Sequence, residues 1–209
     1  MSKRKRKAAK RMTGMVLFAM LVIMAALLLE QQEERTSLDS SQKPAVHAVS
    51  DEVLEYEPLV AKYATKYGIQ AHQDVLLAMM MQESGGRGGD PMQSSESYCG
   101  KRNCIRNPET SIKQGTAYFA RSLEESGGDL KLAVQSYNFG RGFIAYAKAH
   151  GGRYSEETAL AFSRKKYQEA ADPSKFRCLR KAAREQKACY GDIYYVRSVM
   201  KYREAFAGK

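Results

Sequence analysis

The feature that most restricts the fold of this chain is a run of seven apolar residues, Val75 to Met81, which ends two positions before Glu83. A helix over Asp74 to Glu83 would carry apolar side chains on all sides, because successive residues point in different directions around a helix axis. Such a helix is stable only when other elements surround it. Gly85-Gly86 predicts its end. We therefore expect a buried central helix with a carboxylate in its last turn.

Helical patterns also dominate the sequence around this run. Little of it alternates with period two, so the sheet content should be small and the fold class mainly α. Asn107-Pro108 is typical of a helix start, Asp129 is typical of an N-cap, and Gly68 and Gly127-Gly128 are typical of helix ends. The predicted helices cover residues 53–67, 107–123, 129–137, 143–149, 155–171 and 192–206.

The N-terminal region predicts a single membrane anchor. Residues 12–29 carry no charge, and as a helix they would span roughly 27 Å. The Lys/Arg cluster before them should stay in the cytoplasm, which places the chain after Leu29 outside the cell membrane. A cleaved signal peptide is the alternative, but no small-x-small cleavage site follows Leu29 directly. We expect a basic cytoplasmic tail (1–11), a transmembrane anchor (12–29), a polar linker (30–52) and one domain (53–207).

The distribution of charge argues against a nucleic-acid partner. The net charge is +11, but residues 1–11 contribute +7 and the remainder carries only +4. A mildly basic domain behind a very basic tail lacks the basic groove that nucleic-acid binding requires. The three histidines show no metal-ligand spacing, and we expect neither a metal nor a cofactor.

All four cysteines lie in the part of the chain that is expected outside. Four thiols allow three pairings, and the local one, Cys99–Cys104 with Cys178–Cys189, closes the two shortest loops. The spacings C-x4-C and C-x10-C fit a zinc site poorly, and an oxidising location favours disulfides. Free thiols are the remaining alternative. We expect the two local disulfides.

Glu83 is the candidate general acid. A carboxylate in the last turn of a helix lies at the negative end of the helix dipole, and the apolar run before it predicts poor solvation. Both effects raise the pKa of a carboxyl group, as a general acid at neutral pH requires. Gly85-Gly86 would let a polymer approach without side chains in its path. A Glu at a helix end is otherwise usually a solvated neighbour of the cap.

Three segments in this order and at these separations resemble one superfamily. They are Glu83-Ser84-Gly85-Gly86, Met92-Gln93 and Ser136-Tyr137-Asn138-Phe139-Gly140. Together they resemble the goose-type lysozymes and lytic transglycosylases, over about residues 53–206. The run from Gln82 to Ser97 is most similar to the CwlT-type muramidase domain. The small size and single anchor resemble streptococcal wall hydrolases of the pneumococcal vaccine antigen A type. The resemblance implies a lysozyme-like fold and a peptidoglycan substrate.

The resemblance also implies roles for single residues. Glu83 matches the catalytic acid, with Ser84 beside it. Met92 and Gln93 match residues that line the sugar subsites, and Tyr137 and Asn138 match the floor of the cleft. Two departures from the pattern matter: Asp90-Pro91 replaces Gly-Leu, and Phe139 replaces a small residue.

Two chemistries remain open. A hydrolase of the retaining or inverting kind needs a second carboxylate opposite the acid, at about 5 Å or roughly 6.5–9.5 Å. Asp90 is the first candidate and Glu96 the second, although an Asp-Pro turn and a solvated loop acid are the plain alternatives. A lytic transglycosylase needs only Glu83, because by resemblance the N-acetyl group and the C6 hydroxyl of the substrate complete the reaction.

Other side chains near the motif could contact sugar. Ser95 and Ser97 could bond sugar hydroxyls. Because the chain has no tryptophan, Tyr98 and Tyr137 are the best-placed aromatic platforms. Ser-rich loops and most tyrosines have no such role.

The sequence thus predicts a membrane-anchored enzyme that cleaves peptidoglycan glycan strands at the MurNAc-GlcNAc bond, as an N-acetylmuramidase or a lytic transglycosylase. Its expected partners are those strands and the membrane, with division or conjugation machinery as a further possibility. A non-catalytic peptidoglycan-binding or division-site scaffold is the alternative, because a motif alone does not prove turnover.

Overall fold

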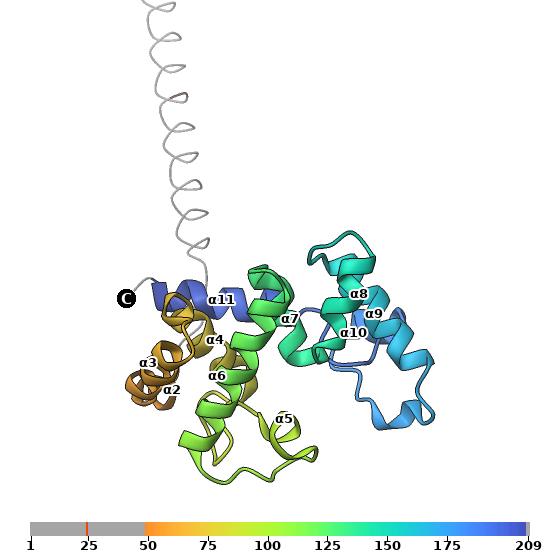
Figure 1. Cartoon of the computed structure of the whole chain (residues 1–209). Helices are drawn as coiled ribbons and strands as arrows, with labels where there is room; N and C mark the ends of the chain where they lie inside the picture. The colour runs from red at the N-terminus through yellow and green to blue at the C-terminus, as the bar shows by residue number, and fades with distance from the viewer. Residues whose placement is uncertain (1–23, 25–48, 208–209) are drawn as a thin grey trace, which may run out of the picture. The chain divides into compact units, whose positions relative to one another are not determined.

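The fold is taken from a computed structural model that describes residue 24 and residues 49–207. The predicted tail and anchor (1–11 and 12–29) and most of the predicted linker therefore lie outside the described residues, apart from Met24 and residues 49–52. No helix within the described residues is long and apolar enough to cross a membrane. Residues 47–209 form one compact unit, whose described part follows (Figure 1).

This unit consists of helices joined by loops, and no strand occurs in residues 49–207. The α-helices are α2 (Asp51–Glu55), α3 (Glu57–Lys66), α4 (Gln73–Glu83), α5 (Ser95–Cys99), α6 (Pro108–Glu125), α7 (Leu130–Phe139), α8 (Gly142–Ala149), α9 (Glu156–Gln168), α10 (Lys181–Glu185) and α11 (Tyr195–Ala207). Two 3-10 turns, Gln70–His72 and Pro173–Lys175, complete the list. The prediction of a mainly α fold is confirmed for this part of the chain.

The central helix lies where the apolar run predicts it. In α4 the six residues from Val75 to Met80 are all buried, and the helix packs mainly against α11. Gly85 and Gly86 follow with φ of 64° and 83°, a left-handed backbone that favours glycine and ends the helix. Glu83 is therefore held at the exit of the most buried helix of the domain.

Two hydrophobic clusters flank α7. One surrounds α4 and includes Met92, Phe119 and Tyr195. The other is built around Phe139, Phe143 and Phe162, and carries α8, α9 and the segment around α10. α7 contributes buried residues to both clusters, so it joins the part of the domain that holds Glu83 to the C-terminal part (Figure 1).

The predicted N-caps are confirmed, whereas one predicted helix is divided in two. The side chains of Asn107 and Asp129 accept hydrogen bonds from Thr110 and Leu132 at the starts of α6 and α7, as predicted. The single helix predicted over residues 53–67 is instead divided into α2 and α3. Pro58 is the physical reason, because it has no N–H for the Leu54 carbonyl and its ring clashes there.

Candidate functional site

Glu83 meets the start of α11 at the end of α4. The Tyr195 hydroxyl donates a hydrogen bond of 2.6 Å to Oε1 of Glu83, which is half-buried. The pKa of Glu83 is raised to about 7: burial is the main cause, the Tyr195 hydrogen bond opposes it, and the negative charges of Asp90 and Asp192 add to it. Glu83 is therefore protonated to a large extent at neutral pH, as a general acid must be.

Asp90 is buried and held by a cage of hydrogen-bond donors. Oδ1 accepts from the Ser94 amide (2.9 Å) and the Ser111 hydroxyl (2.6 Å), while the Ser94 hydroxyl lies 3.4 Å away and donates to the Ser111 carbonyl at 3.0 Å. Oδ2 accepts from the Ser95 amide (3.0 Å) and the Ser95 hydroxyl (2.6 Å). Burial alone would raise the pKa of Asp90, but the hydrogen bonds from Ser111, Ser95 and Ser94 outweigh it and lower the pKa. Asp90 and Glu83 thus have opposite pKa shifts.

The cage also fixes the loop that follows Glu83. The Ser111 hydroxyl accepts from the Met92 amide at 3.0 Å, which joins this loop to α6. The Ser95 hydroxyl accepts from the Ile105 amide at 3.0 Å. Ser95 was predicted to bond sugar hydroxyls, but its side chain is buried and donates to Asp90 while it accepts from Ile105. The structure gives Ser95 a supporting role instead.

Met92 and Tyr137 form the layer beneath this loop. Met92 was predicted to line sugar subsites, but its side chain is fully buried and supports the loop from within the core. The Tyr137 hydroxyl donates to the Met92 carbonyl at 2.8 Å, and burial raises the pKa of Tyr137 well above its usual value. A Cβ on Gly115 of α6 would lie 2.7 Å from the Tyr137 hydroxyl and 2.8 Å from Met92 Cβ.

Ser84 and Asn138 have partners within the protein. The Ser84 hydroxyl donates to the Pro91 carbonyl at 2.7 Å and accepts from the Gly86 amide at 3.0 Å. Asn138 Oδ1 accepts from the Asp192 amide at 2.7 Å. Both side chains are half-buried, so they shape the surroundings of Glu83 and keep some contact with solvent.

Three predicted contact residues are exposed on the loop and on α5. Gln93 adopts a φ of 49°, unusual for a residue with a side chain, and its Nε2 donates to the Asp90 carbonyl at 3.0 Å. Glu96 forms an exposed ion pair with Arg102 at 3.1 Å. Tyr98 is 58% exposed. Gln93 and Tyr98 are therefore free to meet a ligand, and Glu96 is a solvated loop acid.

The cysteines form the two expected disulfides, Cys99–Cys104 and Cys178–Cys189. The local pairing is confirmed, and these cysteines build no zinc site. The first disulfide closes the loop behind α5. The second closes the loop that carries α10, and Cys189 is buried beneath it.

Sequence reasoning missed the partners that come from far along the chain. Tyr195 lies 112 positions from Glu83, and Ser111 lies 21 positions from Asp90. Nothing local marks either residue. The only available signal was the apolar face of the predicted helix over 192–206, which had to pack against the central helix.

A groove of about 610 Å³ lies elsewhere on the domain. It is formed by the end of α3 and the C-terminal half of α6, between residues such as Tyr67, Ala120 and Leu123. None of the candidate site residues lines it. The chemistry of Glu83 and Asp90, not the size of a cavity, therefore locates the site.

A protonatable carboxyl at the exit of a central helix and an ionised carboxylate held by hydrogen bonds are the two carboxyl environments that lysozymes combine. The family model described as lysozyme-like matches residues 50–203. The chain therefore belongs to the lysozyme-like family, as the motifs predicted.

Similar proteins are found in Bacillus subtilis and Streptococcus pyogenes. The bifunctional muramidase/DL-endopeptidase CwlT of Bacillus subtilis is 39% identical over 74% of this chain and 42% of its own length. The uncharacterized membrane protein YocA of the same species is 34% identical over 94% of this chain and 88% of its own. A pneumococcal vaccine antigen A homolog of Streptococcus pyogenes is 38% identical over 57% and 61%. This chain thus spans less than half of CwlT.

A solved structure supports the fold. The crystal structure of a Staphylococcus aureus protein, described as similar to lipoprotein of the NLP/P60 family, matches with a TM-score of 0.64 and 38% identity. The match covers 74% of this chain and 53% of that one.

Proposed function

We propose that this protein cleaves the glycan strands of peptidoglycan at the MurNAc-GlcNAc bond, with Glu83 as the general acid. The observation that carries the proposal is the Glu83 carboxyl, whose pKa is raised to about 7 at the end of a buried helix. Membership of the lysozyme-like family and the similarity to a protein named as a muramidase support the same substrate.

Proton transfer from Glu83 to the glycosidic oxygen is the first step of this mechanism. The bond to the leaving sugar then breaks, and positive charge develops on the remaining sugar ring. The Glu83 carboxylate that results is stabilised by the Tyr195 hydroxyl, which already donates to Oε1 at 2.6 Å. Tyr195 thus holds the acid in place and favours the ionised form as the proton leaves.

Asp90 acts through its charge and its cage in this proposal, and not as a nucleophile. Four donors hold its two oxygens, so attack on a sugar would require several of these bonds to break. Its ionised carboxylate helps to keep Glu83 protonated. Glu96 is exposed and paired with Arg102, which makes it a poor second candidate.

A single-acid route follows. The N-acetyl group of the substrate stabilises the positive charge, and either water or the C6 hydroxyl of the same sugar completes the reaction. Water makes the enzyme a muramidase, and the C6 hydroxyl makes it a lytic transglycosylase.

We also propose that residues 12–29 anchor the domain to the outer face of the cell membrane, ahead of the linker over 30–52. The Lys/Arg cluster before the uncharged span supports this orientation, and the two disulfides fit an oxidising exterior. Fractionation of the intact protein with membranes is expected, whereas a mature N-terminus beyond Leu29 would contradict the anchor.

Mass spectrometry of purified peptidoglycan tests the function. The full-length chain is incubated with glycan strands, and Glu83→Gln is the control. New anhydro-muramic ends identify a transglycosylase and new reducing muramic ends identify a muramidase. No new ends from the wild-type chain would contradict the proposal and favour a peptidoglycan-binding scaffold.

A further inference from the structure

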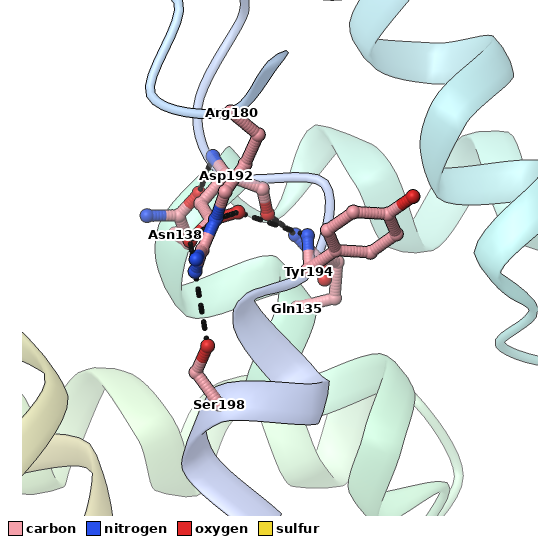
Figure 2. A network of polar contacts seen from close by, with 6 residues as sticks. All are labelled: Gln135, Asn138, Arg180, Asp192, Tyr194 and Ser198. Atoms are coloured by element: carbon pink, nitrogen blue, oxygen red, sulfur yellow. Dashed lines mark hydrogen bonds and ion pairs between the residues drawn. The ribbon is translucent and has the colours of Figure 1, made fainter. Parts of the chain in front are cut away.

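A partly buried ion pair, between the half-exposed Arg180 and the buried Asp192, lies between the disulfide-closed loop and the start of α11 (Figure 2). The Asp192 side chain is 4% exposed. Arg180 Nε donates to both carboxylate oxygens, at 3.1 and 3.2 Å, and a terminal nitrogen donates to Oδ2 at 2.6 Å. The same guanidinium reaches the Ser198 hydroxyl at 3.0 Å. Arg180 thus connects the loop between Cys178 and Cys189 to the first turn of α11.

Hydrogen bonds with side chains of α7 hold the backbone of Asp192. Gln135 Nε2 donates to the Asp192 carbonyl at 3.0 Å, and the Asp192 amide donates to Asn138 Oδ1 at 2.7 Å. The Tyr194 amide donates to Asp192 Oδ1 at 2.9 Å (Figure 2). Gly191 permits this close approach, because a Cβ there would lie 2.6 Å from Asn138 Oδ1. Side chain and backbone of Asp192 are therefore both saturated.

This network ends at the catalytic carboxyl. The Tyr195 amide donates to the Asp192 carbonyl at 3.1 Å, and the hydroxyl of the same tyrosine donates to Glu83. A shift of Asp192 therefore moves the tyrosine that holds the acid. A buried carboxylate that loses its partner charge has a strong tendency to move or to draw in water.

We propose that Arg180 is a positioning residue for Glu83: its ion pair with Asp192 fixes the start of α11, and so holds the Tyr195 hydroxyl against the acid. This inference rests on the proposed function, and it extends the catalytic apparatus to the disulfide-closed loop over 178–189. That loop is distant from Glu83 in sequence.

The charged and titratable groups that face Glu83 determine whether its pKa rises or falls when Arg180 is lost. They are Tyr195 of α11, Tyr137 of α7, Asp90 of the following loop and Asp192. The Tyr195 hydrogen bond lowers the pKa of Glu83, so the loss of Arg180, which weakens this bond, raises that pKa. The loss also leaves the negative charge of Asp192 unpaired, and this charge raises the pKa of Glu83 as well. Both changes act in the same direction, so the pKa of Glu83 should rise.

The pKa of Glu83 is measured by NMR titration of its labelled side-chain carboxyl in the full-length chain, assigned with Glu83→Gln. Arg180→Gln is expected to raise this pKa, and Arg180→Lys, which keeps the charge without the fork, to raise it less. Arg197→Gln is the matched control. Arg197 also lies on α11 and forms a forked ion pair, but this pair, with Glu156 of α9, is exposed. Arg197→Gln should leave the pKa unchanged.

Cleavage rates supply the second readout. Arg180→Gln is expected to lose on the order of tenfold or more in rate, and to have little further effect in a Tyr195→Phe background, because both changes act through one contact. A folded Arg180→Gln or Arg180→Lys chain with the wild-type pKa of Glu83 would overturn the inference. The NMR readout needs no turnover, so it decides this inference even where the wild-type chain proves inactive and the proposed function fails.

Discussion

At the residue scale, Glu83 and Asp90 are two carboxyl groups whose surroundings push their pKa values apart. Glu83 has one donor, Tyr195, and an apolar helix behind it, so its neutral form is favoured. Asp90 is buried as well, but four hydrogen bonds, from the Ser111 and Ser95 hydroxyls and the Ser94 and Ser95 amides, favour its ionised form. Burial raises the pKa of both groups, and the additional hydrogen bonds to Asp90 reverse the sign of its shift.

The raised pKa of Glu83 predicts how activity depends on pH. The active form is the protonated acid, so cleavage should decline as the pH rises through about 7. Stability has the same sign, because a raised folded-state pKa gives stability that is present below the unfolded value near 4.5 and lost as the pH rises through about 7. Glu83→Gln should remove this loss and stabilise the fold above pH 7 by about 3 kcal/mol. pH–rate profiles and denaturant unfolding at several pH values measure both effects.

Asp90→Asn should unfold more easily than the wild-type chain. In the wild-type chain the Ser95 amide and hydroxyl both donate to a carboxylate oxygen of Asp90. The NH2 group of an asparagine at that place would put a donor against these two donors. The expected cost is about 2–4 kcal/mol in denaturant unfolding, with reduced cleavage as a consequence. Glu96→Gln is the control, since that acid is exposed. Wild-type stability together with complete loss of cleavage would instead indicate a nucleophilic Asp90.

At the element scale, the site depends on how closely α6 approaches the loop after Glu83. Gly115 lies inside α6, directly beneath Met92 and Tyr137. A helix would ordinarily gain about 1 kcal/mol from alanine at such a position. Here the missing Cβ makes room for the Tyr137 hydroxyl and for its hydrogen bond to Met92.

Gly115→Ala is therefore expected to destabilise the domain by about 1–3 kcal/mol, in spite of the better helix propensity of alanine. It should also lower cleavage, because the loop over 90–95 must shift. Gly142→Ala in α8 is the matched control, with no atom within 4 Å of the added Cβ. Thermal unfolding of both variants tests this prediction. If Gly115→Ala were as stable as Gly142→Ala, the close contact of the added Cβ at position 115 would be easily relieved.

At the scale of the whole molecule, local signals predicted the elements and long-range packing determined the site. Three signals each span only a few residues, and the structure confirms what each predicted. They are the apolar run, the caps Asn107 and Asp129, and the helix end at Gly85-Gly86. The division at Pro58 was also a local signal, and it was overlooked.

Most contacts of the site could not be predicted in this way. Burial of Met92, the cage around Asp90 and the Tyr195 hydrogen bond depend on α6, α7 and α11 meeting in space. A single sequence indicates that these helices pack together, but not which side chains meet. Met92, Ser95 and Tyr137, three of the residues predicted as sugar contacts, support the loop that carries Gln93 in the structure.

The central claim is that Glu83 is the acid that cleaves the glycan, and the rate of Glu83→Gln tests it most directly. Glutamine keeps the size of the side chain but cannot donate a strongly acidic proton. Release of soluble glycan fragments from purified peptidoglycan should fall on the order of 10²–10⁴-fold, while circular dichroism and sedimentation with peptidoglycan stay unchanged. Wild-type release of fragments by a folded Glu83→Gln chain would contradict the account.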